Sequence, residues 1–164
     1  MTPQRLYQTA IRIALDELAQ MGIASTPQAA RFVLAIALQE SNLNHRRQVT
    51  AGGDELGPAV SFWQFEQGGG CKGVLTHRSS ANAMVAMCDA YNVRPTSASL
   101  WEAMRYQDVI AAAAARLLLF TLPSKLAMTP QEGWLQYMSA WRPGKPHPEK
   151  WAECWRIASQ TVGC

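Results

Sequence analysis

The stretch Ala29-Ala30-Arg31-Phe32-Val33-Leu34-Ala35-Ile36-Ala37-Leu38, with Gln39-Glu40-Ser41-Asn42 after it, determines how this chain is built. Ala29 to Leu38 is apolar nearly all round, which is typical of a helix buried on most of its sides. Thr26-Pro27-Gln28 precedes it and predicts its start, because Thr caps free backbone N–H groups and Pro is favoured at the first helical position. We therefore expect a central buried helix that ends in a short polar segment.

Further helices are expected on both sides of a long insert that lacks the helical period. Thr-Pro-Gln also occurs at Thr2 and at Thr129, where Glu132 completes a capping box. Besides the central one, the predicted helices run from Thr2 to about Gly22, from Ser80 to Ala90, from Ser99 (with Glu102 as a second capping box) to about Phe120, from Thr129 to about Ala140, and over a last segment with Trp151, Cys154, Trp155 and Ala158 on one stripe.

The insert from about Leu43 to Gly73 is rich in glycine and aromatic residues, which favours a short β-hairpin or an irregular segment around residues 45–70. Within it, Gly68-Gly69-Gly70 is interpreted as a flexible turn. The predicted fold class is mainly α, with about six helices and this one insert.

Length and composition limit the classes of protein that the chain can be. With 164 residues we expect one domain, and 48% hydrophobic residues exclude intrinsic disorder as the main state. A net charge of +3 is too small for a nucleic-acid footprint, and no apolar run is long enough to span a bilayer. We expect no metal and no cofactor, because the four cysteines form no zinc pattern; free buried thiols are the default, with one disulfide possible.

Carboxylates are scarce, and few of them lack a routine role. Of twelve Asp and Glu residues, those on polar helix faces or at helix caps leave Glu40, Asp54, Glu55 and Glu66. Glu40 ends a helix that is otherwise apolar, so burial would raise its pKa and keep it able to donate a proton near neutral pH. The alternative is a Glu side chain that turns outward into solvent.

Three motifs resemble those of lysozyme-like lytic transglycosylases, the superfamily of soluble lytic transglycosylases and goose-type lysozymes. Glu40-Ser41-Asn42-Leu43-Asn44 resembles their Glu-Ser-x-x-Asn signature, and Gly57 to Glu66 resembles the glycine-led stretch with Gln, in its bacteriophage form. Trp141-Arg142-Pro143-Gly144 loosely matches their aromatic-Asn-Ala-Gly element. The resemblance implies a single lysozyme-like catalytic domain over residues 1–164, with an α+β lysozyme-like fold.

The implied reaction cleaves the β-1,4 bond between N-acetylmuramic acid and N-acetylglucosamine, with Glu40 as general acid/base. A hydrolase needs a second carboxyl group about 5 to 10 Å away, for which Asp54 and Glu55 are candidates together with Glu66. A lytic transglycosylase needs one acid, because the acetamide of the substrate assists and its 6-hydroxyl closes a 1,6-anhydro ring. The residues expected on the substrate side are Ser41, Gln64, Trp63, Tyr137 and Trp141. Ser41 would orient Glu40 or merely cap the helix end.

The expected partner is the glycan strand of peptidoglycan, bound by a monomer without nucleic acid and without membrane insertion. Because Met1 to Arg5 lacks the pattern of a signal peptide, we expect synthesis in the cytoplasm of a host bacterium and action on the cell wall, as an endolysin or as a virion component. One alternative is a non-catalytic virion or tail-assembly protein that binds wall glycan with the same fold. Another is a chitin-cleaving enzyme.

Overall fold

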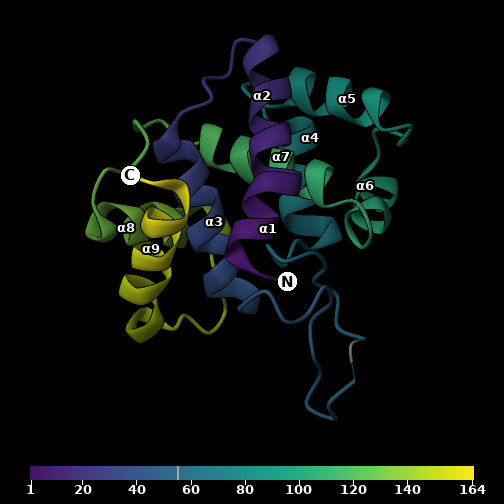
Figure 1. The fold of residues 1–164 in the computed structure, drawn as a ribbon. Helices are drawn as coiled ribbons and strands as arrows, with labels where there is room; N and C mark the ends of the chain where they lie inside the picture. Colours follow the sequence, from purple (N-terminus) through teal and green to yellow (C-terminus); the bar gives the residue numbers. More distant parts are fainter. Residues whose placement is uncertain (55) are drawn as a thin grey trace.

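The computed structural model describes residues 1–54 and 56–164, and it is mainly helical (Figure 1). The first helical stretch comprises α1 (Pro3–Leu6), a π-helical turn η1 (Tyr7–Ile11) and α2 (Arg12–Gln20). The remaining elements are α3 (Pro27–Ser41), the π-helical turn η2 (Gln67–Cys71), α4 (Lys72–Thr76), α5 (Ala81–Ala90), α6 (Ser97–Met104), α7 (Asp108–Phe120), α8 (Pro130–Trp141) and α9 (Pro148–Val162). None of the described helices is long and apolar enough to cross a bilayer.

The three Thr-Pro-Gln sequences all begin helices, as predicted. The hydroxyl oxygens of Thr2, Thr26 and Thr129 accept hydrogen bonds from backbone N–H groups three residues on, at 3.1–3.3 Å. At Thr129 the Glu132 carboxylate also accepts the backbone N–H of the capping residue at 3.2 Å, so the predicted capping box is confirmed. Each start satisfies donors that a helix end would otherwise leave free.

The predicted helix from Ser99 to Phe120 is wrong, because the structure divides it into α6 and α7. Thr96, not Ser99, caps α6, and its hydroxyl oxygen accepts the Ser99 N–H at 3.2 Å. Gln107 is extended and interrupts the helix, so that Asp108 begins α7 and its carboxylate pairs with Arg46. The ion pair connects this helix to the insert, which is a long-range contact that local patterns do not encode.

The expected turn at Gly68-Gly69-Gly70 is also wrong, because these residues belong to the π-helical turn η2, which continues directly into α4. Packing overrides the weak helix propensity of glycine here. A Cβ atom at Gly70 would lie 2.5 Å from the Phe65 ring, so the helical turn can pack against Phe65 only with glycine at that position.

The core is arranged around α3, in which Ala29 to Gln39 are all buried. Its Phe32 ring packs edge-on against Trp155 and Trp151 of α9, with ring centroids 5.4 and 6.1 Å apart. Figure 1 shows α8 and α9 together on one flank of α3, with α2, α5 and α7 on the other. The alanines of α7 (Ala111 to Ala115) are fully or almost fully buried, and the buried side chains form one cluster.

The insert between α3 and η2 is irregular, and in Figure 1 it projects from the helical body. Its described residues form no strand, only isolated bridges from Val60 to Arg47 and to Phe65. Long-range hydrogen bonds fasten it to the helices: Arg46 Nη2 donates to Asp108 at 2.7 Å, and Trp101 Nε1 donates to the Pro58 carbonyl at 2.7 Å. Of the two forms expected for this segment, the structure has the irregular one.

All four cysteines are free thiols. Cys71, Cys88 and Cys154 are buried, and Cys164 is exposed at the end of the chain. The disulfide that the sequence left open is absent from this structure.

Candidate active site

Glu40 lies in the last turn of α3, next to the point where the chain leaves the helix through a left-handed Asn42 with φ of 48°. Burial against the core raises the pKa of its carboxyl group from the ordinary 4.5 to about 7, and a hydrogen bond from Tyr137 opposes that rise only partly. The pKa rises because burial removes hydration that stabilises the charged carboxylate more than the neutral acid. Near neutral pH Glu40 can therefore both give and take a proton.

Tyr137 donates this hydrogen bond from α8, across the site, with its hydroxyl 2.6 Å from Glu40 Oε1. Its ring is 2% exposed and stacks against Trp151 at a centroid distance of 5.4 Å. Burial, with the nearby Glu40 charge, raises the pKa of Tyr137 far above its ordinary value, so the hydroxyl stays protonated. The phenol is thus a fixed donor that holds one oxygen of Glu40.

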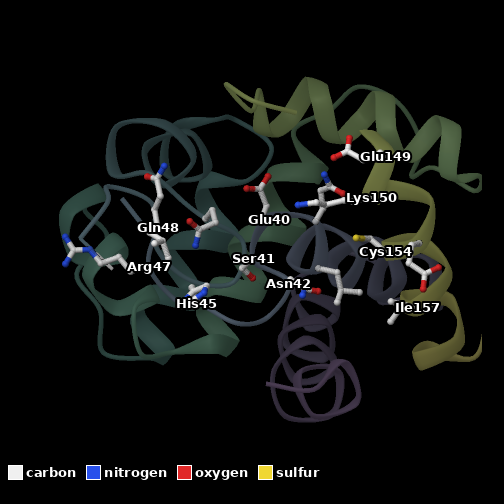
Figure 2. A pocket seen from close by; sticks show the side chains of 15 residues that line it. Glu40, Ser41, Asn42, His45, Arg47, Gln48, Glu149, Lys150, Cys154 and Ile157 are labelled. Atoms are coloured by element: carbon white, nitrogen blue, oxygen red, sulfur yellow. The ribbon is translucent and has the colours of Figure 1, made fainter. Parts of the chain in front are cut away.

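Two clefts meet at Glu40. The first, of about 640 Å³, lies between the end of α3, residues 45–49 and α9, and the second, of about 400 Å³, lies between residues 64–70 and 140–145. Glu40, Gln48 and Gln64 line both of them. Figure 2 shows Glu40 between Gln48 on one side and Glu149 and Lys150 on the other. The acid therefore stands at the centre of a site that extends in two directions.

Gln64 and Trp141 lie where the sequence predicts a substrate-side role. Gln64 adopts a left-handed backbone with φ of 52°, and its Nε2 donates to the Ser61 carbonyl at 2.8 Å. Trp141, half-buried at the end of α8, lines the second cleft and donates from Nε1 to the Trp63 carbonyl at 2.9 Å. The structure thus brings Glu40, Gln64 and Trp141 to the clefts from three distant parts of the chain. The prediction that Tyr137 contacts substrate is wrong, because its side chain is buried, lines neither cleft and reaches the site only through its hydrogen bond to Glu40.

Trp63 does not line a cleft, which corrects the prediction that it contacts substrate. Its side chain is completely buried, and Nε1 donates to the Val33 carbonyl in the middle of α3 at 2.8 Å. The ring fills the core beneath the insert, where no ligand can stack on it. Phe62 and Phe65 beside it are buried as well.

Ser41 does not orient Glu40; the alternative, that it caps the helix end, describes it better. Its hydroxyl lies 3.0 Å from the Ala37 carbonyl and 2.9 Å from the Phe62 carbonyl, and it accepts the Leu43 N–H at 3.2 Å. Ser41 therefore ties the end of α3 to the insert that carries Gln64.

The insert holds the acidic residues predicted as a second carboxylate opposite Glu40, and the structure treats them differently. Asp54 is exposed and lies outside the residues that line either cleft, so the expectation that it faces Glu40 is not met. Glu55 lies outside the described residues. Glu66, by contrast, is exposed and lines the second cleft.

The sequence reasoning missed two acids of α9. Glu149 and Glu153 line the first cleft together with Lys150, although the amphipathic pattern assigns them to a solvent-facing surface. At helical spacing these two acids share one side of α9 with Cys154 and Ile157, and this spacing could have indicated that they face a common cleft. Within the described part of the chain, no group of three or more His, Cys, Asp or Glu side chains is arranged to hold a metal ion.

Comparison of the chain with protein-family models, with curated proteins and with solved structures yields no match.

Proposed function

We propose that this protein is a lysozyme-like lytic transglycosylase of the bacteriophage type, which cleaves the β-1,4 bond between N-acetylmuramic acid and N-acetylglucosamine in peptidoglycan. The observation that carries the proposal is the position of Glu40, a carboxyl group with a pKa of about 7 where two clefts meet. A linear glycan laid through both clefts would place one of its linkages at this acid.

Glu40 is the general acid in the first half of the proposed reaction. Its proton passes to the glycosidic oxygen as the bond from that oxygen to C1 of the muramic acid breaks, and the acetamide of the same sugar assists. Glu40, now a carboxylate, then takes the proton from the 6-hydroxyl, whose oxygen bonds to C1 and closes the 1,6-anhydro ring. A pKa near the working pH suits both steps.

Tyr137 positions Glu40 for this work. By donating to Oε1 it leaves Oε2 to face the scissile oxygen, and it stabilises the carboxylate that forms after proton transfer. Gln64 lines both clefts and Trp141 lines the second, so both would contact the sugar rings. Asp54 does not line the clefts, so a hydrolytic variant of the reaction would have to draw its second carboxylate from acids that do, such as Glu66 or Glu149.

Two measurements on purified protein test the proposal. Glu40→Gln should abolish release of soluble fragments from peptidoglycan, whereas Glu102→Gln, in an exposed ion pair on α6, should release them at the wild-type rate. Mass spectrometry of the products should show anhydro ends, one water lighter than reducing ends. If wild type and Glu40→Gln release fragments equally poorly, the chain is instead a glycan-binding virion or tail-assembly protein.

The remaining outcomes separate related enzymes. Reducing ends would make the protein a muramidase with a second carboxylate, which Glu66→Gln, Glu149→Gln and Glu55→Gln would identify. Cleavage of chitin oligomers without cleavage of peptidoglycan would make it a chitin-cleaving enzyme. We also propose that the protein reaches the wall as an endolysin or as part of a virion; its presence in or absence from purified virions decides between these two.

A further inference from the structure

Gln48 is a cleft residue to which the proposed reaction gives no role. Among the described residues, Glu40, Gln48 and Gln64 are those that line both clefts, so all three lie where the clefts meet. In Figure 2 the side chains of Gln48 and Glu40 extend in the same direction. A glycan with one of its linkages at Glu40 would therefore also pass the Gln48 amide.

Backbone hydrogen bonds fix the position of Gln48 in the insert. Its N–H donates to the Ala59 carbonyl at 2.8 Å, and its carbonyl accepts the Gly57 N–H at 3.0 Å. The neighbouring Arg47 donates from Nε to the Gly57 carbonyl at 3.0 Å. Although the Gln48 side chain is exposed, its backbone is thus already in place, and a ligand would not have to order it.

Gly57 determines where the Gln48 side chain can lie. A Cβ atom at Gly57 would lie 2.6 Å from Gln48 Cβ and 2.8 Å from both Cγ and Oε1. These distances are well inside the roughly 3.5–4.0 Å at which carbon atoms pack, so any side chain at residue 57 would force that of Gln48 to move. Gly57 itself lines neither cleft, and it acts on the site through Gln48.

The amides of Gln48 and Gln64 differ in what they already bind. Gln64 Nε2 donates to the Ser61 carbonyl at 2.8 Å, whereas the Gln48 side chain forms no hydrogen bond within the described part of the chain. A primary amide carries two N–H donors and one acceptor oxygen. The sugars of a glycan present acceptor oxygens in their hydroxyl and acetamide groups. Gln48 Nε2 is therefore a free donor at the point where such oxygens would pass.

We propose that Gln48 is a substrate-binding residue, whose Nε2 donates a hydrogen bond to an oxygen of the sugars that flank the linkage at Glu40. The inference rests on the proposed function, because it takes the glycan to lie through both clefts. The acceptor is an acetamide carbonyl or a hydroxyl oxygen, since both offer the same chemistry to an N–H group. Gly57 is the positioning residue that keeps this donor in place.

Binding measurements on a chain that cannot cleave test this assignment. In the Glu40→Gln background, a tetrasaccharide of alternating N-acetylglucosamine and N-acetylmuramic acid is titrated calorimetrically. Gln48→Met removes the donors at similar side-chain length, and Gln48→Glu replaces them with an acceptor. Each should weaken binding about three- to tenfold, as expected for one lost hydrogen bond, and leave the free energy of unfolding unchanged. Gln8→Met, a matched change of an exposed glutamine outside the clefts, should leave the affinity unchanged.

Two further titrations examine the positioning residue and the acceptor. Gly57→Ala should weaken binding by a similar factor, but it should add nothing in a Gln48→Gly chain, which has no side chain to displace. The Gln48→Met titration is repeated with the de-N-acetylated tetrasaccharide. A loss of affinity for the acetylated form alone assigns the acetamide carbonyl as acceptor, and a loss for both forms assigns a hydroxyl oxygen.

The contrary outcomes keep the two proposals distinguishable. If Gln48→Met and Gln48→Glu bind the tetrasaccharide as tightly as the parent chain, the assignment of Gln48 is overturned and the proposed function stands. If Gly57→Ala weakens binding equally with and without the Gln48 side chain, the positioning role of Gly57 is overturned. Absence of binding to the parent Glu40→Gln chain overturns the proposed function, and the assignment with it.

Discussion

Glu40 is a carboxyl group whose surroundings favour its neutral form, and this should be visible in stability as well as in activity. The unfolded chain ionises it near pH 4.5, whereas the folded protein keeps the proton up to about pH 7. The unfolded state therefore loses its proton first, and the free energy of unfolding falls as pH rises between these values. Above pH 7 the loss is complete.

Glu40→Gln should remove this loss, because the amide carries no charge and can still accept the Tyr137 hydrogen bond. We expect the variant to be more stable than wild type at pH 8, by at most about 3 kcal/mol, and equally stable near pH 4. Urea unfolding at several pH values measures the difference. A difference that does not change between pH 4 and pH 8 would contradict the buried placement of the carboxyl group.

Tyr137→Phe should move the pH dependence of activity. The phenol lowers the pKa of Glu40, so its removal raises that pKa and extends the protonated, active form to higher pH. We expect the falling limb of the pH profile to shift upward from about pH 7, with kcat reduced about tenfold because Glu40 is no longer held. The measurement is kcat and kcat/KM between pH 5 and 9. Tyr106→Phe, on a side chain that is 70% exposed, should leave the profile unchanged.

At the scale of elements, the contact between α8 and α9 depends on one small residue. Gly133 of α8 faces the indole rings of α9: a Cβ atom there would lie 2.4 Å from Trp155 and 3.1 Å from Trp151. Such a close approach positions Tyr137, one turn later on the same helix, over Glu40. Glycine is unfavourable inside a helix, and here the close approach of the indole rings explains its presence.

Gly133→Ala should therefore destabilise the protein by about 1–3 kcal/mol, despite the better helix propensity of alanine. Gly73, in α4, provides the opposite case, because a Cβ atom there has no neighbour within 4 Å. Gly73→Ala should stabilise the protein by about 0.5–1 kcal/mol. Chemical denaturation measures the free energy of unfolding of both variants. If Gly133→Ala were as stable as Gly73→Ala, the contact between α8 and α9 would have room for a Cβ atom.

At the scale of the whole molecule, the insert is held in place by hydrogen bonds to the helices around it. Trp63 makes one of these with the Val33 carbonyl, and Ser41 makes another with the Phe62 carbonyl. Together they place Gln64 beside the end of α3. The cleft is thus a product of the packing of the insert on the helical body.

Trp63→Phe separates a core role from a ligand-binding role. Loss of the Nε1 hydrogen bond and of ring volume should lower stability by about 2–4 kcal/mol. KM for peptidoglycan should stay within about twofold of wild type at temperatures where the variant is folded, because the buried indole does not touch substrate. A KM raised tenfold or more, with stability unchanged, would return Trp63 to the binding surface. Thermal unfolding and steady-state kinetics provide the two readouts.

Local sequence patterns predict most helices well, but they do not predict features that depend on contacts between distant residues. The Thr-Pro-Gln starts and the buried stripe of α9 follow from contacts within four residues, and these predictions are confirmed. The break between α6 and α7 at the extended Gln107 was missed, since the local pattern is helical on both sides and the Asp108 contact that follows it is with Arg46, 62 positions earlier. The helical form of Gly68 to Gly70 was missed because glycine has weak local preferences and the contact with Phe65 decides its conformation.

By itself, the sequence determined that α3 is buried and that Glu40 stands at its end, because an unbroken apolar run leaves no solvent-facing side and a helix terminus is set by its neighbours. It did not determine what surrounds Glu40. Tyr137, which bonds to Glu40, is 97 positions away, and Glu149 and Lys150, which line the same cleft, are farther still, so only the tertiary packing of the helices brings them to this site. The same packing buried Trp63 instead of exposing it, since an indole N–H within reach of a helix carbonyl is more stable in the core.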